Sequence, residues 1–197
     1  MRIEQTFTGQ FIILCYIILL VYWFAKASKV KRDIKKRNLW WWRIPPFAML
    51  GIIFVSLKIG GHLSQYIVVI LWPSAGTNFM IGIIADIVCL TGLIVALWAR
   101  TTLSGNWNAG ATLKEDHELI KRGPYSLVRH PIYSGILLMF FSIAIWYGRI
   151  AGFAFFASCF LAYWLKAINE EDLMMQHFPN EYPEYKKNVK ALIPFVF

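Results

Sequence analysis

Residues 121–135 read Lys-Arg-Gly-Pro-Tyr-Ser-Leu-Val-Arg-His-Pro-Ile-Tyr-Ser-Gly and stand between two strongly apolar parts of the chain. They gather three cations, one histidine and two tyrosines just before an apolar run. Pro131 suits the first turn of a helix that begins there. Polar and ionisable groups are costly beside a membrane and usually have a function. The stretch therefore predicts part of a functional site at a membrane surface.

The rest of the chain has the composition of an integral membrane protein. It is 58% hydrophobic and 16% charged over 197 residues, with a mean hydropathy of +0.52. Soluble domains average about 45–50% apolar and about 25% charged residues. The length suits a single domain, so residues 1–197 are expected to form one membrane domain.

Five apolar segments are expected to be membrane helices, which gives an all-α integral membrane fold. About 20 apolar residues cross the hydrocarbon layer. The first segment could be a signal peptide, but few positive charges precede it and a dense basic cluster follows it, which favours a span. The last two segments are short and are expected to form a hairpin of tilted or partly sunken helices. The expected spans are 7–27, 45–72, 79–99, 132–147 and 150–165.

The basic residues are concentrated on one side of these spans. Eight Lys and Arg residues lie in 26–43, five in the loop 100–131 and four in the C-terminal segment 166–197. The opposite side has only Arg2 and Arg149. Cytoplasmic loops are enriched in Lys and Arg, so the N-terminus is expected outside and the C-terminus and site in the cytoplasm. The membrane would be a cell inner membrane or one of the ER type. This placement explains the net charge of +9 without nucleic acid.

Two charged residues lie well inside the apolar segments, away from their ends, and three cysteines lie there too. Asp86 and Lys58 are functional candidates by default and could also form a structural pair between neighbouring spans. Cys15, Cys89 and Cys159 lack the spacing of metal ligands, which predicts buried free thiols and no metal site.

A second polar cluster, Glu170-Glu171, follows the last expected span. The hairpin would bring it beside Arg129 and His130, so that a cationic cluster faces an anionic one. Tyr133 lies about one helical turn from His130 and is expected to face the same pocket.

These motifs together resemble the isoprenylcysteine carboxyl methyltransferase family and the related phospholipid methyltransferases. The resemblance covers about residues 104–195, and the order and spacing of the motifs make it specific. One departure is Pro179-Asn180, where the family usually has a glycine after the phenylalanine. The motifs are Gly123-Pro124-Tyr125, Arg129-His130-Pro131-x-Tyr133-x-Gly135, Glu170-Glu171-Asp172-Leu173, Phe178-x-x-Glu181-Tyr182-x-x-Tyr185 and Ile193-Pro194.

The resemblance implies that S-adenosyl-L-methionine binds between the hairpin and the C-terminal segment. The chain has no Gly-x-Gly-x-x-Gly pattern of a soluble dinucleotide site. The residues expected to bind the cofactor are His117, Gly123, Tyr125, His130, Glu170 and Glu171. The residues expected to act in catalysis are Arg129, Tyr133 and Glu170, with Arg129 able to hold a substrate carboxylate bidentately.

Each of these residues also has a purely structural interpretation. Arg129 could anchor the chain to lipid, and His130 could cap a helix. Tyr133 could belong to the aromatic belt of the interface, and Glu170-Glu171 could be a solvated helix face.

The reaction expected from the resemblance is carboxyl O-methylation of a lipophilic, isoprenylcysteine-like substrate. A carboxylate is ionised at neutral pH and needs no general base. The main alternative is N-methylation of a phospholipid amine, which would need a base. Two further alternatives are an NADPH-dependent enzyme similar to sterol reductases and a membrane subunit without catalysis. The expected partners are a lipophilic small molecule or prenylated substrate and membrane lipid, with no nucleic acid.

Overall fold

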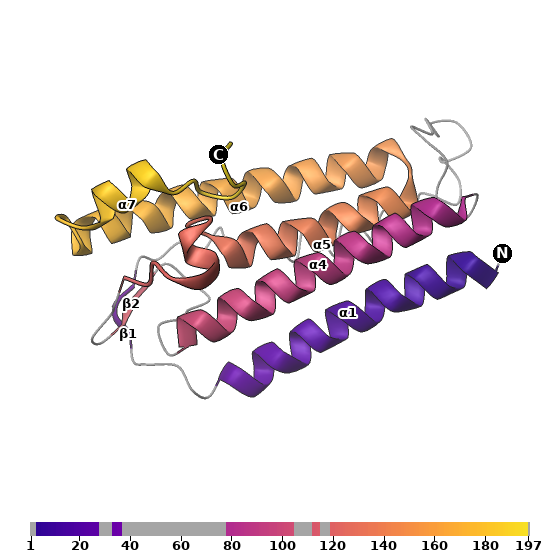
Figure 1. Cartoon of the computed structure of the whole chain (residues 1–197), viewed down its shortest axis with the longest axis horizontal. Helices are drawn as coiled ribbons and strands as arrows, with labels where there is room; N and C mark the ends of the chain where they lie inside the picture. Colours follow the sequence, from indigo (N-terminus) through magenta and orange to yellow (C-terminus); the bar gives the residue numbers. More distant parts are fainter. Residues whose placement is uncertain (1–2, 28–32, 37–77, 105–111, 115–118, 197) are drawn as a thin grey trace.

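The computed structural model describes residues 3–27, 33–36, 78–104, 112–114 and 119–196. Within these residues the regular secondary structure is helical apart from one pair of short strands and one isolated β-bridge. The long helices lie side by side along the long axis of the molecule (Figure 1). They are α1 (Ile3–Ala27), α4 (Phe79–Leu103), α5 (Pro131–Tyr147) and α6 (Ile150–His177).

The short elements gather at one end of this bundle (Figure 1). Strands β1 (Asp33–Lys36) and β2 (Thr112–Lys114) pair antiparallel. The 3₁₀ helix η3 (Gly123–Ser126) precedes α5, and α7 (Tyr182–Asn188) follows α6. One end of the bundle thus holds most of the irregular and polar chain.

Helix α5 is the centre of the described bundle, because it packs against α4 on one side and α6 on the other. Helix α1 packs mainly against α4. The buried side chains of α5 include Met139, which is fully inaccessible, and Phe140, which contacts the ring of Phe155 in α6 at a centroid distance of 5.6 Å. The core therefore depends on α5, the helix that begins in the polar stretch.

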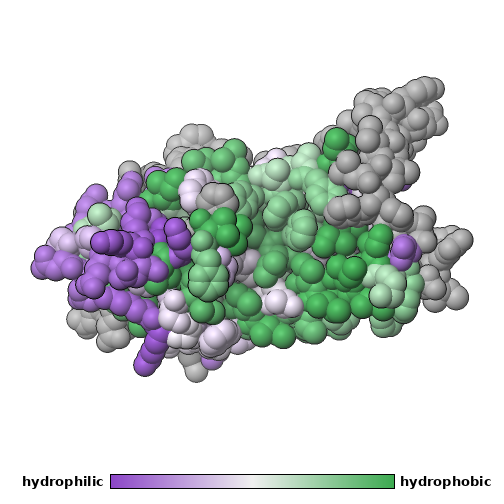
Figure 2. Space-filling model, turned by 45° about the horizontal axis from the view of Figure 1, so that its top comes forward, coloured by the Kyte–Doolittle hydropathy of each residue, from purple (hydrophilic) through white to green (hydrophobic). Residues whose placement is uncertain are grey.

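The helices have the length and apolar surface of a membrane protein. Three of them are long and apolar enough to cross a membrane, over Phe7–Lys26, Phe79–Leu103 and Gly152–His177. Helix α5 is apolar but shorter, with 17 residues. Figure 2 shows hydrophobic surface along most of one face and hydrophilic surface gathered at one end. The prediction of a helical integral membrane protein is confirmed, and the expected span 45–72 lies outside the described residues.

Helix α6 differs from the expectation of a short, sunken helix. It has 28 residues and continues past Leu165 to His177. The apolar run ends at Leu165, but the polar residues that follow keep the chain helical. Glu170 and Glu171 therefore lie on the same helix as the last expected span.

Helices α4 and α5 approach each other at two glycines. A Cβ atom added to Gly92 would lie 2.5 Å from the carbonyl oxygen of Gly135, and one added to Gly135 would lie 2.6 Å from the oxygen of Gly92. The same added atom on Gly135 would lie 2.7 Å from the backbone nitrogen of Ala96. Backbone atoms cannot rotate away as side chains do, so any larger residue must move the helices apart.

We expect Gly135→Ala to lower the free energy of unfolding by about 1–3 kcal/mol, the range for an overpacked core. This loss outweighs the gain of about 1 kcal/mol that alanine brings to a helix. Thermal unfolding in detergent measures it. Thr91→Ala, on the exposed surface of α4 beside Gly92, is the matched control. A Gly135→Ala protein as stable as the control would contradict the close approach.

Asp86 lies in α4, and its carboxylate interacts with the side chain of Thr8 in α1, which is buried. This contact links two neighbouring helices. Lys58 lies outside the described residues, so the expected pairing of Asp86 with Lys58 stays a prediction.

Candidate active site

The polar stretch and the C-terminal segment run beside each other at the end of the bundle. Val128 and Lys190 form a parallel β-bridge. The backbone N–H of Arg129 donates to the oxygen of Lys190 at 2.8 Å, and that of His130 donates to the oxygen of Ala191 at 2.9 Å. These bonds fix the backbone at the two residues that precede α5. The position of Arg129 and His130 thus depends on chain about 60 residues further on.

The turn before this bridge is held by a buried tyrosine. Gly123 begins η3 with a φ of +62°, a conformation that favours glycine. Tyr125 in η3 is buried, and its carbonyl oxygen accepts a hydrogen bond of 2.5 Å from the hydroxyl of Tyr185 in α7. Burial raises the pKa of Tyr185, more than the nearby Arg129 lowers it. The hydroxyl therefore stays protonated and remains a donor.

We expect Tyr185→Phe to loosen this turn by leaving the buried Tyr125 carbonyl without its donor, at a cost of about 1–3 kcal/mol. Hydrogen exchange at the amides of Arg129 and His130 reports the effect, because both amides are protected by the C-terminal segment. Exchange should accelerate in the variant and stay unchanged in Lys187→Ala, an exposed position in α7. Equal exchange in both variants would show that the tyrosine does not hold the turn.

Arg129 is bound to Glu171 and to the C-terminal segment. Its Nε and Nη2 atoms lie 2.8 and 2.6 Å from Glu171 Oε1. Its Nη1 atom donates to the backbone oxygens of Lys186, at 3.1 Å, and of Val189. The other carboxylate oxygen, Glu171 Oε2, lies 2.9 Å from Lys186 Nζ. We call Arg129, Glu171 and Lys186 the clasp, because it joins the start of α5, α6 and α7.

The clasp is almost shielded from solvent at its centre. The side chains of Arg129 and Glu171 are 9% and 5% exposed, whereas that of Lys186 is 45% exposed. A buried pair of this kind contributes little net stability when both partners are present. Removal of one partner leaves a buried charge without compensation, which costs far more.

Beside the clasp, His130, Tyr133 and Glu170 form a second cluster. The Tyr133 hydroxyl donates to Glu170 Oε1 at 2.6 Å. The His130 ring is stacked on the Tyr133 ring with centroids 5.3 Å apart and planes 1° apart. His130 Nδ1 lies 3.7 Å from Glu170 Oε2, and Nε2 lies 3.3 Å from Glu171 Oε1. His130 therefore joins the two clusters.

The structure brings together most of the residues that the sequence predicted for the site. Pairwise contacts connect Arg129, His130, Tyr133, Glu170 and Glu171 into one network, as the hairpin predicted. Gly123 and Tyr125 lie in the adjacent turn η3. His117 lies outside the described residues, so its role stays a prediction. The roles of the others in catalysis and in cofactor binding also stay proposals.

Two cations at the site were not predicted. Lys186 completes the clasp from α7. Lys166 of α6 lies with its Nζ atom 5.0 Å from the centroid of the Tyr133 ring. One signal could have found Lys166, because it precedes Glu170 by four residues and so shares its helix face. The partners of Lys186 depend on how the C-terminal segment returns to α5. The sequence around Lys186 does not predict this path.

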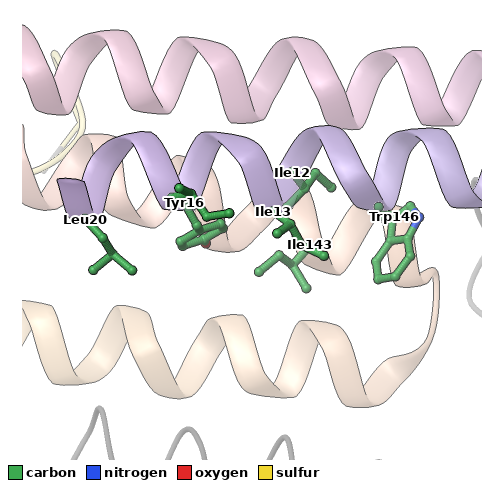
Figure 3. Close-up of a pocket in the computed structure, with 8 residues that line it drawn as sticks. Ile12, Ile13, Tyr16, Leu20, Ile143 and Trp146 are labelled. Carbon is green, nitrogen blue, oxygen red and sulfur yellow. The ribbon is translucent and has the colours of Figure 1, made fainter. Parts of the chain in front are cut away.

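An apolar cavity of about 280 Å³ lies elsewhere, between α1 and α5. Figure 3 shows its lining side chains, with Tyr16 and Leu20 from α1 and Ile143 and Trp146 from α5. None of the predicted site residues lines it. Across the described part of the chain, no group of three or more His, Cys, Asp or Glu side chains could hold a metal ion.

Comparison with known proteins identifies the family. The sequence model of the phospholipid methyltransferase family matches residues 80–181, more than half of the chain. The chain belongs to this family. The match includes α4, η3, α5 and the whole of α6, so it contains both polar clusters except Lys186. The methyltransferase predicted from the motifs is thus confirmed as a family assignment.

Relatives of the methyltransferase include isoprenylcysteine enzymes. It is 24% identical over 178 residues to the probable protein-S-isoprenylcysteine O-methyltransferase of Oryza sativa subsp. indica, which covers 89% of this chain and 88% of that protein. It is 30% identical over 128 residues to the protein-S-isoprenylcysteine O-methyltransferase of Dictyostelium discoideum, over 62% of this chain and 53% of that protein. It is also 30% identical over 125 residues to the uncharacterized protein YpbQ of Bacillus subtilis, over 63% of this chain and 73% of that protein. The predicted resemblance to isoprenylcysteine methyltransferases is confirmed.

A solved structure shares the fold of the methyltransferase. The eukaryotic intramembrane Ras methyltransferase ICMT, isoprenylcysteine carboxyl methyltransferase, aligns with a TM-score of 0.58 at 20% sequence identity. The alignment covers 81% of this chain and 54% of the solved chain. The methyltransferase thus spans about half the length of that protein.

Proposed function

We propose that the methyltransferase transfers a methyl group from S-adenosyl-L-methionine to the carboxylate of a lipophilic, isoprenylcysteine-like acceptor. The observation that carries this proposal is the cluster of His130, Tyr133 and Glu170 beside the clasp, at the polar end of a membrane bundle. The relatives named for isoprenylcysteine support the acceptor. The family assignment supports the transfer of a methyl group.

The residues around Tyr133 fit the polar groups of S-adenosyl-L-methionine. Glu170 keeps 18% of its side chain exposed, and its carboxylate can accept hydrogen bonds from an ammonium or from ribose hydroxyls. His130 and the backbone of Gly123 and Tyr125 would face the carboxylate or the adenine edge. Glu171 is a weaker candidate than the sequence predicted, because three cationic or imidazole groups already occupy it. When bound, the cofactor supplies an electrophilic methyl group.

The protein's contribution would be alignment and exclusion of water. A carboxylate acceptor is already ionised and needs no proton removed at neutral pH. Holding its oxygen in line with the methyl group converts the reaction to an effectively unimolecular one. Tyr133 and Glu170 would hold the methyl donor in this alignment. The apolar helices around them would strip water from the acceptor.

A phospholipid amine is the second candidate acceptor, and the family name is the observation that favours it. An amine arrives protonated and would need a base, for which His130 or Glu170 is available. With either acceptor, the lipophilic substrate would enter the site from the bilayer.

We also infer the orientation and the complete set of spans from the sequence. The distribution of Lys and Arg supports an N-terminus outside and a C-terminus and site in the cytoplasm. The arrangement of five spans in one membrane domain, with residues 45–72 as the second span, remains our proposal.

Two measurements on the full chain in detergent test the function. Calorimetry should show binding of S-adenosylhomocysteine and no binding of NADPH, which a relative of sterol reductases would prefer. Labelled methyl groups should then appear in a farnesylcysteine analogue and not in phosphatidylethanolamine. If only phosphatidylethanolamine becomes labelled, the acceptor is an amine and not a carboxylate. Binding of neither nucleotide would refute both enzymatic interpretations.

A further inference from the structure

A lysine lies inside the candidate site where α6 leaves the apolar part of the bundle. Lys166 is half-buried, and its Nζ atom lies 5.0 Å from the centroid of the Tyr133 ring. Four residues further along α6, Glu170 accepts the hydroxyl proton of the same tyrosine. Four residues of helix are about 6 Å along the axis. Lys166 thus lies about one turn nearer the apolar bundle than Glu170.

Arg129, which the sequence proposed as the clamp for a substrate carboxylate, is engaged elsewhere. Its Nε and Nη2 atoms contact Glu171, and its Nη1 atom donates to two backbone oxygens of the C-terminal segment. A bidentate grip on a second carboxylate requires two adjacent N–H groups. Arg129 could offer this grip only by leaving Glu171 buried without its main partner, which is costly.

The surroundings of Lys166 suit a molecule that is apolar with an anionic head. Tyr163 lies three residues before Lys166 on the same face of α6, and the centroids of the Tyr163 and Tyr133 rings are 5.0 Å apart. This part of α6 belongs to a segment apolar enough to lie in a membrane. A lipophilic chain could lie along this aromatic face with its anionic head at the lysine. An ammonium head would instead meet a positive charge at this point.

The charged side chains of the site also favour an anionic acceptor. The clasp has two cations, Arg129 and Lys186, for the single carboxylate of Glu171. Lys166 and Glu170 add one charge of each sign. These five side chains together have one more positive than negative charge, which favours an anionic acceptor.

We propose that Lys166 binds the carboxylate of the acceptor and so makes the site select acids over amines. This inference rests on the proposed function, because it assigns the acceptor end of the same site. It separates two roles around Tyr133. Glu170 and His130 serve the methyl donor, and Lys166 serves the acceptor.

Steady-state kinetics on the full chain tests the proposal, with a farnesylcysteine analogue as the acceptor. Lys166→Gln should raise KM for this acceptor about 10- to 100-fold, the cost of losing a hydrogen bond to a charged group. Its dissociation constant for S-adenosylhomocysteine should stay within about threefold of wild type. Lys166→Arg, which keeps the positive charge, should restore most of the affinity for the acceptor. Lys187→Gln, an exposed lysine of α7, is the matched control.

The outcomes separate this inference from the proposed function. If wild type methylates only phosphatidylethanolamine, the proposed carboxyl reaction is wrong, and the selectivity assigned to Lys166 is wrong with it. If wild type methylates the farnesylcysteine analogue and Lys166→Gln keeps the wild-type KM, the inference alone is overturned. A matching loss of affinity for S-adenosylhomocysteine would also overturn it, because the lysine would then serve the donor. If Lys166→Gln does not fold, the Lys166→Arg protein decides, since a raised KM there would refute a role based on charge.

Discussion

Replacement of Glu171 by alanine is expected to detach the C-terminal segment and to lower the free energy of unfolding by about 3–5 kcal/mol, the cost of breaking a buried ion pair. The reason is that Arg129 would keep its charge at 9% exposure while losing its main partner. Lys186 would lose its partner as well. Chemical or thermal unfolding in detergent measures the loss, and hydrogen exchange at Arg129 shows whether the β-bridge to Lys190 has opened.

Two controls make this expectation specific. Glu184→Ala removes an exposed carboxylate of α7 and should leave stability nearly unchanged. The double variant Arg129→Met with Glu171→Leu removes both charges and should be more stable than either single variant. Additive losses in the double variant would contradict a coupled, buried pair. The same reasoning changes the meaning of Arg129→Ala, which should destabilise the protein as well as reduce activity.

The second large effect is expected at Glu170. Glu170→Gln should weaken S-adenosylhomocysteine binding about 10- to 100-fold, because an ammonium or hydroxyl donor would lose a charged acceptor. Methyl transfer should fall with it. Stability should stay close to wild type, since the amide oxygen can still accept the hydroxyl of Tyr133. Calorimetry and unfolding of the same preparation measure the two quantities together.

Glu181→Gln is the matched control for this change. Glu181 is 61% exposed and pairs with Lys121 at 3.0 Å on the surface. Exposed pairs of this kind contribute at most about 1 kcal/mol. The variant should therefore bind S-adenosylhomocysteine like wild type. If the Glu170→Gln protein binds S-adenosylhomocysteine as tightly as wild type does, Glu170 does not belong to the cofactor site.

Hydrophobic patterning was sufficient to predict how the two polar clusters meet. Two apolar segments joined at Gly148 must run antiparallel, so the residues at their free ends, Arg129 and Glu171, lie together. Gly148 indeed ends α5 in the left-handed conformation, with a φ of +67°. This part of the site follows from the topology of a hairpin and needs no knowledge of side-chain packing.

The parts that sequence reasoning missed depend on other information. Hydropathy falls after Leu165 and predicts the end of the membrane span there, whereas helical structure continues on polar residues to His177. The chemistry of Arg129 suits a carboxylate, and the sequence leaves open whether that carboxylate belongs to the substrate or to the cofactor. Its actual partners include the backbone oxygens of Lys186 and Val189, and any residue type supplies such oxygens. The sequence therefore has no signal for this contact.

The β-bridge between Val128 and Lys190 also has a consequence for biosynthesis. Arg129 leaves the ribosome 60 residues before Val189, the residue whose carbonyl it contacts. At about 5–20 residues per second, this interval lasts about 3–12 s. During that time α5 can enter the membrane while the guanidinium of Arg129 still lacks the backbone oxygens of Lys186 and Val189. The candidate site is thus assembled last, and a ribosome that stalls within α7 would leave a membrane-inserted protein in which this site has not formed.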